Sequence, residues 1–208
     1  CNPFFLFGEV GIGKTHLAHA IGNAAMNADK ADRVGYVSAS RFAEKASDAR
    51  YGHALDAFRA NYGRWDLLIF DDIQFLSERV EAQEEFFHLF NALHQVGRQI
   101  VVVSDRPPDR LGQLEKRLVS RFAGGVVAAV KAPDKEARCE ILRRAAEDGS
   151  VAVPTDLIEL VASRIPGDVR KMMGGFKKIL ALRAIVGEDM SIGKAAEVLD
   201  DLEGEDAA

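Results

Sequence analysis

The chain has 208 residues, of which 48% are hydrophobic and 28% charged, and its formal net charge is −5. This balance is typical of a globular protein with one or two domains, and it argues against a globally basic nucleic-acid-binding protein. The two cysteines, Cys1 and Cys139, exclude a disulfide framework and suit a reducing cytosol, so we expect a cytoplasmic location. No apolar run is long enough to span a membrane.

Five short apolar runs alternate with helical segments in the first part of the chain. They are rich in β-branched and aromatic residues, as is typical of strands buried on both faces of a parallel sheet. The runs cover residues 4–7, 34–37, 67–70, 100–103 and 126–130. Residues 15–28 and 84–96, which lie between runs, have the apolar spacing of helices. The alternation predicts an α/β fold in which helices flank a parallel sheet.

The pattern changes at residues 131–134, which read Lys-Ala-Pro-Asp. Beyond this point the spacing and the capping residues predict helices and no strand. The predicted helices cover residues 135–147, 155–164, 169–186 and about 192–202. The sequence therefore predicts an α/β nucleotide-binding core over residues 1–130 and a small all-helical lid domain over residues 131–208.

The strongest chemical motif lies between the first predicted strand and the helix that follows it. It reads Gly-Glu-Val-Gly-Ile-Gly-Lys-Thr over residues 8–15 and has the spacing of a P-loop. Glycines let backbone N–H groups surround phosphate oxygens, and the helix N-terminus adds its positive dipole. Lys14 would reach the β- and γ-phosphates of ATP or ADP, and the Thr15 hydroxyl would ligate Mg²⁺. The expected nucleotide-binding residues are Gly8, Glu9, Val10, Gly11, Ile12, Gly13, Lys14, Thr15 and His16.

Polar residues follow two further predicted strands. Asp71 and Asp72 directly follow the run 67–70. A carboxylate at the end of a strand beside a P-loop can serve as the outer Mg²⁺ ligand. We assign that role to Asp71, and Asp72 would orient or deprotonate the attacking water, as the second acidic residue does in AAA+ enzymes. Ser104 and Asp105 directly follow the run 100–103, at the place where AAA+ proteins carry a polar sensor near the γ-phosphate. Either residue could serve, and we choose Asp105.

Several longer motifs follow one another in an order that resembles that of the AAA+ domain of the bacterial DnaA family. The resemblance covers almost the whole chain. It rests on Gly-Lys-Thr-His-Leu at 13–17, Asp-Asp-Ile-Gln-Phe at 71–75, Gln-Glu-Glu-Phe-Phe-His at 83–88, Phe-Asn-Ala-Leu at 90–93, Ser-Asp-Arg-Pro-Pro at 104–108, Leu at 118 with Ser-Arg-Phe at 120–122, and Val-Arg at 169–170.

The resemblance implies roles for three arginines. Arg121 matches the arginine finger of the family, which reaches the ATP of the neighbouring subunit in an assembled filament, and Arg117 would support the same interface. A cation supplied in this way stabilises transition-state charge and couples nucleotide state to assembly. Arg170 matches sensor 2, which contacts the γ-phosphate from the lid.

The chain departs from the family at several positions. Ala-Gly-Gly follows Phe122, where the family usually has an acidic or small residue followed by Trp-Gly. Glu81 stands near the position of a basic residue that holds single-stranded DNA, with Arg79 close by. An acidic residue there would repel phosphate, which puts stretching of a DNA strand in doubt. The sequence begins without an initiator methionine, which indicates a fragment, and it leaves open whether an origin-binding domain follows residue 208.

The preferred hypothesis is a DnaA-type domain that acts as an ATP-controlled assembly switch in initiation of chromosomal replication, with slow Mg²⁺-dependent hydrolysis of ATP. Its expected partners are further copies of the chain in a filament, single-stranded or origin DNA, and a DnaA-family or replisome protein. One alternative is a stand-alone regulator such as Hda, which binds a protein partner and opens no DNA. Another is a helicase loader related to DnaC and IstB, which accounts less well for residues 83–88 and 104–108. The sequence does not decide the rate of hydrolysis.

Overall fold

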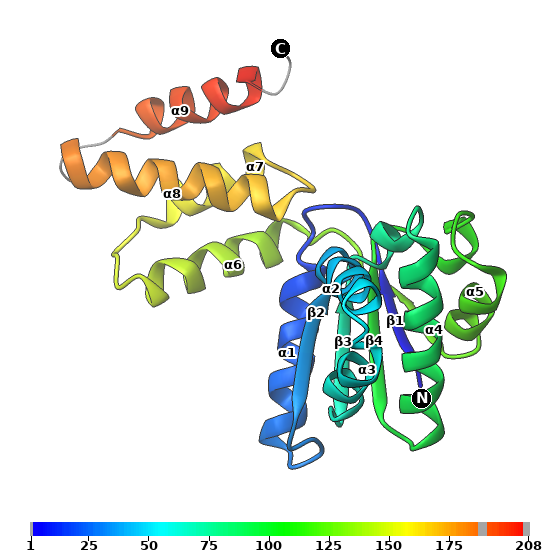
Figure 1. Cartoon of the computed structure of the whole chain (residues 1–208). Coiled ribbons are helices and arrows are strands. Elements are labelled where there is room, and N and C mark those ends of the chain that lie inside the picture. Colours follow the sequence, from blue (N-terminus) through cyan, green and yellow to red (C-terminus); the bar gives the residue numbers. More distant parts are fainter. Residues whose placement is uncertain (1, 187–190, 206–208) are drawn as a thin grey trace. The chain divides into compact units, whose positions relative to one another are not determined.

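The structure is a computed structural model, and it describes residues 2–186 and 191–205. Five strands in the described residues form one parallel sheet with the spatial order β2-β3-β4-β1-β5 (Figure 1). The strands are β1 (Phe4–Phe7), β2 (Val34–Ser38), β3 (Leu67–Asp71), β4 (Gln99–Ser104) and β5 (Val126–Ala129). The predicted α/β class is therefore confirmed, and each strand lies within about one residue of its predicted position.

Helices and short 3-10 turns connect these strands and continue after the sheet. They are α1 (Lys14–Asn27), α2 (Ala39–Tyr51), α3 (Leu55–Gly63), η1 (Ile73–Leu76), α4 (Val80–Gln95), η2 (Pro108–Arg110), α5 (Lys116–Ala123), α6 (Lys135–Asp148), α7 (Thr155–Arg164), α8 (Val169–Val186) and α9 (Ile192–Glu205). None of the helices within the described residues is both long enough and apolar enough to cross a membrane.

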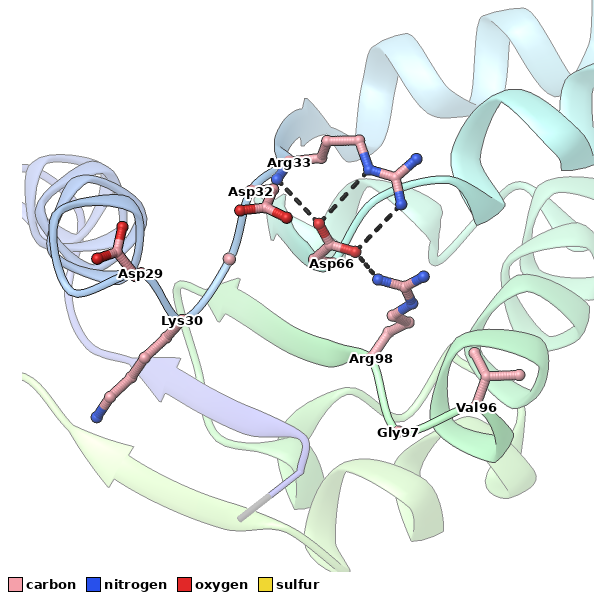
Figure 2. Close-up of a pocket in the computed structure, with 9 residues that line it drawn as sticks. Asp29, Lys30, Asp32, Arg33, Asp66, Val96, Gly97 and Arg98 are labelled. Atoms are coloured by element: carbon pink, nitrogen blue, oxygen red, sulfur yellow. Dashed lines mark hydrogen bonds and ion pairs between the residues drawn. The ribbon is translucent and has the colours of Figure 1, made fainter.

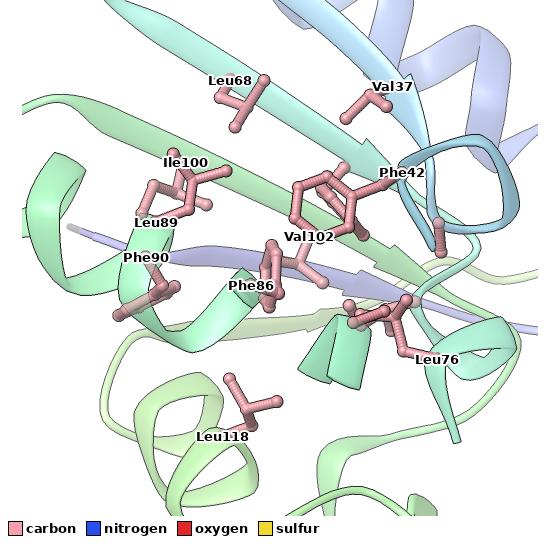
Figure 3. Close-up of a cluster of buried hydrophobic side chains, with 14 of the residues drawn as sticks. Val37, Phe42, Leu68, Leu76, Phe86, Leu89, Phe90, Ile100, Val102 and Leu118 are labelled. Carbon is pink, nitrogen blue, oxygen red and sulfur yellow. The ribbon is translucent and has the colours of Figure 1, made fainter. Parts of the chain in front are cut away.

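Buried side chains fill both faces of the sheet. One cluster joins the sheet to α2, α3, α4 and α5, and its centre is a group of aromatic rings around Phe42 and Phe86 (Figure 3). The second cluster joins the opposite face to α1 and includes Leu6, Ala18 and Ile69. Because the strands β1, β3 and β4 are covered on both sides, their sequences are almost continuously apolar.

One expectation about burial was wrong. Residues 126–130 were predicted to form a strand buried on both faces, but Val126 and Val127 of β5 are 38% and 40% exposed. The reason is topological, since β5 pairs only with β1 and forms an edge of the sheet. Apolar composition alone does not distinguish an edge strand from a central one.

The chain divides into two compact units. The first comprises Cys1–Glu9 and Lys14–Val130, and the second comprises Val10–Gly13 and Lys131–Ala208. The second unit contains α6 to α9, which share their own apolar core; this core includes Leu142, Val161, Phe176 and Leu199. Four residues that precede the helix α1 thus belong to the helical unit.

Candidate nucleotide-binding site

The loop between β1 and α1 depends on two glycines in the left-handed region. Gly11 has φ of +84° and Gly13 has φ of +99°, backbone angles that L-residues with a side chain rarely adopt. At Gly11 a Cβ atom would also meet the carboxylate of Asp168, which would have to shift. The backbone of this loop therefore favours glycine at both positions for conformational reasons.

Lys14 is held close to the loop that precedes it. Its side chain is 8% exposed, and Nζ donates a hydrogen bond to the carbonyl oxygen of Glu9 at 2.7 Å. The side chains of Glu9 and Val10 are exposed, and so is that of His16 on α1. The ammonium group thus contacts the backbone at the start of the loop.

The predicted sensor Arg170 lies at the start of α8, in the same unit as Gly11. The carbonyl oxygen of Gly11 accepts hydrogen bonds from the backbone N–H groups of Val169 at 2.9 Å and of Arg170 at 3.3 Å. Asp168 caps the helix, since its Oδ1 accepts a hydrogen bond from the N–H group of Lys171 at 2.9 Å. The backbone of Arg170 therefore contacts the loop, while its side chain is exposed.

Asp71 and Thr15 come together although they are 56 residues apart in the sequence. Asp71 is the last residue of β3 and is 2% exposed. The Thr15 hydroxyl donates to its Oδ2 at 2.8 Å, and the N–H group of Asp72 donates to its Oδ1 at 2.9 Å. The structure thus joins the two residues that the sequence predicted as Mg²⁺ ligands.

This pair fits a hard divalent cation. Because the Thr15 hydroxyl gives its hydrogen to Asp71, its lone pairs remain available to a cation. Mg²⁺ prefers oxygen ligands and is commonly held by one or two protein oxygens together with phosphates and waters. The donor set therefore agrees with the chemistry of a magnesium–nucleotide site.

Tyr36 is a functional candidate that the sequence analysis missed. Its hydroxyl donates to Oδ2 of Asp71 at 2.7 Å, and its ring stacks on that of His19 with 4.3 Å between centroids. Burial raises the pKa of the Tyr36 phenol, and the hydrogen bond to Asp71 and the charges of Asp71 and Asp72 raise it further. The phenol therefore stays protonated and acts as a donor. A polar-tipped aromatic residue within the run 34–37 was the only signal in the sequence.

Gln74 is a second residue whose role was missed. Its Nε2 donates to Oδ1 of Asp72 at 2.9 Å, and its Oε1 accepts from the N–H group of Asp105 at 3.3 Å. Asp72 has φ of +58°, an uncommon value for a residue with a side chain. Gln74 thus links the ends of β3 and β4 and brings the two predicted catalytic aspartates into one hydrogen-bonded group.

The two sensor candidates at the end of β4 differ in their surroundings. Asp105 binds the guanidinium group of Arg106 through both carboxylate oxygens, each at 2.7 Å. Ser104 is fully buried, and its hydroxyl accepts a hydrogen bond from the N–H group of Arg106 at 3.2 Å. The carboxylate of Asp105 is therefore already paired with a cation, and because it only accepts hydrogen bonds it would meet a phosphate through a donor between them, such as Arg106 or water.

Arg121 lies on a different surface of the core unit, on α5. It is exposed, and it borders a cavity of about 440 Å³ that is also lined by Phe87, Phe90 and Gly124. The guanidinium group of Arg117 lies over the ring of Phe87 at 4.2 Å. Two arginines thus stand one helical turn apart on an exposed surface, as an interface with another chain would require.

Glu81 has a cationic neighbour. It lies in the first turn of α4, and one of its carboxylate oxygens is 3.7 Å from Arg50 of α2. Arg50 also pairs with Glu84 at 3.0 Å and with Glu85 at 3.6 Å. The region therefore presents a mixed set of charges rather than an uninterrupted acidic surface.

The parallel sheet, the glycine loop and the Thr15–Asp71 pair define a P-loop protein of the AAA+ class. The sequence model of the Bacterial DnaA ATPase domain matches residues 1–129. The chain belongs to this DnaA family. The match does not favour the alternative of a stand-alone regulator.

Three relatives illustrate the similarity. The chromosomal replication initiator DnaA of Gloeobacter violaceus is 42% identical over 198 residues, which are 95% of this chain and 45% of the relative. Domain III of DnaA from Thermotoga maritima has a TM-score of 0.91 at 37% identity, covering 97% of this chain and 84% of that one. A DnaA structure bound to AMPPCP and single-stranded DNA has a TM-score of 0.75 at 37% identity, covering 86% of this chain and 55% of that one. The chain thus spans less than half the length of the first relative.

Proposed function

We propose that this chain binds ATP with Mg²⁺ and that the bound nucleotide controls its assembly with further copies during initiation of chromosomal replication. The observation that carries the proposal is the hydrogen bond of 2.8 Å between Thr15, which follows the glycine loop, and the buried Asp71. Support also comes from the DnaA relative that was solved with AMPPCP, an ATP analogue.

The nucleotide would be held mainly by groups of the loop. The N–H groups of residues 8–13 and the N-terminus of α1 would surround the phosphates, and Lys14 would move from the Glu9 carbonyl to the β- and γ-phosphates. Thr15 and Asp71 would hold Mg²⁺, which neutralises charge on the phosphates. His16 would complete the set from the first turn of α1.

Hydrolysis is the second part of the proposal. Asp72 would orient the attacking water, with Gln74 holding its carboxylate at 2.9 Å. Asp105 would report on the γ-phosphate at the end of β4, and Arg170 would do so from α8. Arg121 of one copy would complete the site of the next copy and stabilise the charge of the transition state. Turnover would be slow in the absence of assembly, because the arginine comes from another chain.

The variant Lys14→Ala tests the nucleotide site. Calorimetric titration should show that it binds ATP at least about a hundredfold more weakly than the wild type, because a charged contact to phosphate is lost. Lys30→Ala is a matched control that lies after α1, outside the loop. Wild-type ATP affinity in Lys14→Ala would refute the assignment of the loop.

The variant Arg121→Ala tests assembly. It should bind ATP like the wild type but lose ATP-dependent self-association in analytical ultracentrifugation, because its role lies in the neighbouring site. Arg144→Ala is the control, since this arginine is 73% exposed on α6 and pairs only locally with Glu140. Unchanged assembly of Arg121→Ala would show that the finger assignment is wrong.

Binding of single-stranded DNA is the most specific part of the proposal. Fluorescence anisotropy of a labelled oligonucleotide, at fixed salt, should rise with ATP and not with ADP. The variant Glu81→Lys should strengthen this binding and steepen its dependence on salt, because one more cation meets the phosphates. Absence of DNA binding in the ATP-bound protein would leave protein partners as the target of the switch.

A further inference from the structure

The Asp71 carboxylate receives side-chain hydrogen bonds from two elements of the core unit, α1 and β2. Its Oδ2 accepts a hydrogen bond from the Thr15 hydroxyl of α1 at 2.8 Å and one from the Tyr36 hydroxyl of β2 at 2.7 Å. The metal-binding prediction accounts for the first of these bonds. It gives no reason for the second, which comes from an edge strand of the sheet.

The position of Tyr36 explains how it reaches the carboxylate. In the register of β2 and β3, Ser38 lies opposite Asp71, and Tyr36 lies opposite Ile69. Tyr36 is thus two residues back along the strand, which corresponds to about 6.6 Å. A long side chain that leans along the strand can cover this distance, and the phenol ends on the Asp71 oxygen.

The ring of Tyr36 is supported from the helix that carries Thr15. His19 of α1 stacks on it with 4.3 Å between ring centroids and 26° between ring planes. His19 is one helical turn after Thr15, so the support for the ring and the hydroxyl of Thr15 come from one rigid element. The stack limits rotation of the ring and therefore fixes the direction of the phenol.

We propose that Tyr36 is a positioning residue that orients the Asp71 carboxylate for the metal ion of the bound nucleotide, with His19 as its support. The inference rests on the proposed function. Both side-chain donors to Asp71 Oδ2 are neutral hydroxyls, so they orient the carboxylate without adding a positive charge. Hydrogen-bonded partners of metal-binding groups fix the orientation of those groups and thereby raise metal affinity.

The test is the Mg²⁺ requirement of nucleotide binding in Tyr36→Phe, a change that keeps the ring and its stack and removes the hydroxyl. A fluorescent ATP analogue is titrated with the protein in EDTA and then at a series of Mg²⁺ concentrations. The half-saturating Mg²⁺ concentration should rise about tenfold, as expected for a lost hydrogen bond to a charged group, while the affinity in EDTA stays unchanged. A wild-type Mg²⁺ requirement would overturn the proposal.

Two controls separate this role from a structural one. Tyr51→Phe makes the same chemical change at an exposed position at the end of α2, and it should leave both measurements unchanged. His19→Leu keeps the phenol but removes the stack, and it should raise the half-saturating Mg²⁺ concentration by a smaller factor, roughly two to three. If Tyr36→Phe lowers the melting temperature without altering the Mg²⁺ requirement, Tyr36 is structural and the proposal is wrong.

The proposed function and this inference fail in different ways. A wild-type protein that binds no ATP, or binds it equally well in EDTA, would contradict the proposed function. A wild-type protein that binds ATP with Mg²⁺, together with a Tyr36→Phe variant of the same Mg²⁺ requirement, would contradict only the role of Tyr36.

Discussion

Strand β3 has an aspartate at each end, and the two carboxylates have different partners. Asp66 precedes the strand and lies between Arg33 and Arg98, beside a cavity of about 560 Å³ (Figure 2). Asp71 ends the strand and receives the hydroxyls of Thr15 and Tyr36. The negative charge of Asp66 is paired with the guanidinium groups of Arg33 and Arg98. The hydroxyl donors orient the Asp71 carboxylate without neutralising its charge, so that it can bind a cation.

The comparison suggests a rule for this protein. Outside the proposed site, to which the arginine-paired Asp105 belongs, carboxylates that face arginines stabilise the fold, and the amount depends on how deeply they are buried. The carboxylate that faces hydroxyls serves the nucleotide. Exchanging the partners, or removing the charge, should therefore affect stability at one end of β3 and nucleotide binding at the other.

The largest effect is expected for Asp71→Asn. Removing this charge should lower nucleotide affinity in Mg²⁺ by roughly tenfold to a hundredfold, because a metal-binding group is lost. The free energy of unfolding should fall by less than about 1 kcal/mol or even rise, because a buried charge is removed. Calorimetric titration and urea unfolding measure the two quantities. A strong loss of stability with unchanged nucleotide affinity would show that Asp71 serves the fold rather than the nucleotide.

Glu85 of α4 is more deeply buried than Asp66 and Glu84. It is 2% exposed and binds Arg59 through both oxygens at 2.9 and 3.0 Å. Arg59→Met should lower the free energy of unfolding by about 2 kcal/mol, less than for a fully buried pair because Arg59 is 44% exposed. ATP affinity should not change. Arg144→Met at the exposed pair on α6 is the control, and equal losses for both variants would contradict the dependence on burial.

Asp66→Asn should have an intermediate effect. The side chain of Asp66 is 16% exposed, and the change weakens its contacts with Arg33 and Arg98. The expected loss is about 1 kcal/mol in the free energy of unfolding, with no change in Mg²⁺-dependent affinity for ATP. Denaturant unfolding and the nucleotide titration should be made on the same preparation. A loss of nucleotide affinity here would show that both ends of β3 serve the same site.

The smallest effect concerns Glu84, an exposed carboxylate that is also paired with an arginine. The hydrogen bond from Arg50 holds the pKa of Glu84 below its ordinary value. A depressed pKa means that the pair stabilises the fold above about pH 4.5 and that this contribution is lost as the pH falls through the folded-state pKa. The melting temperature of Glu84→Gln should therefore lie slightly below that of the wild type at pH 7. The difference should shrink as the pH falls through the folded-state pKa of Glu84, and a gap that widened in acid would contradict the assignment.

The sequence predicted the parts of this site that depend on local order. The glycine spacing before Lys14 and the acidic end of an apolar run identified the loop and Asp71, because each motif lies within a few residues. The link from Tyr36 to Asp71 was missed because it joins residues 35 apart, and the link from Gln74 to Asp105 because it joins residues 31 apart. Such contacts depend on strand register and on which strands are neighbours, and a local pattern contains neither. The exposure of β5 was missed for the same reason.

The central proposal is that the loop at residues 8–15 and Asp71 form one magnesium–nucleotide site. The most direct test is a calorimetric titration of the wild-type protein with ATP, once in Mg²⁺ and once in EDTA. We predict binding of one ATP per chain that weakens at least about tenfold when Mg²⁺ is removed. An absence of binding, or an affinity that is the same in both buffers, would contradict the claim.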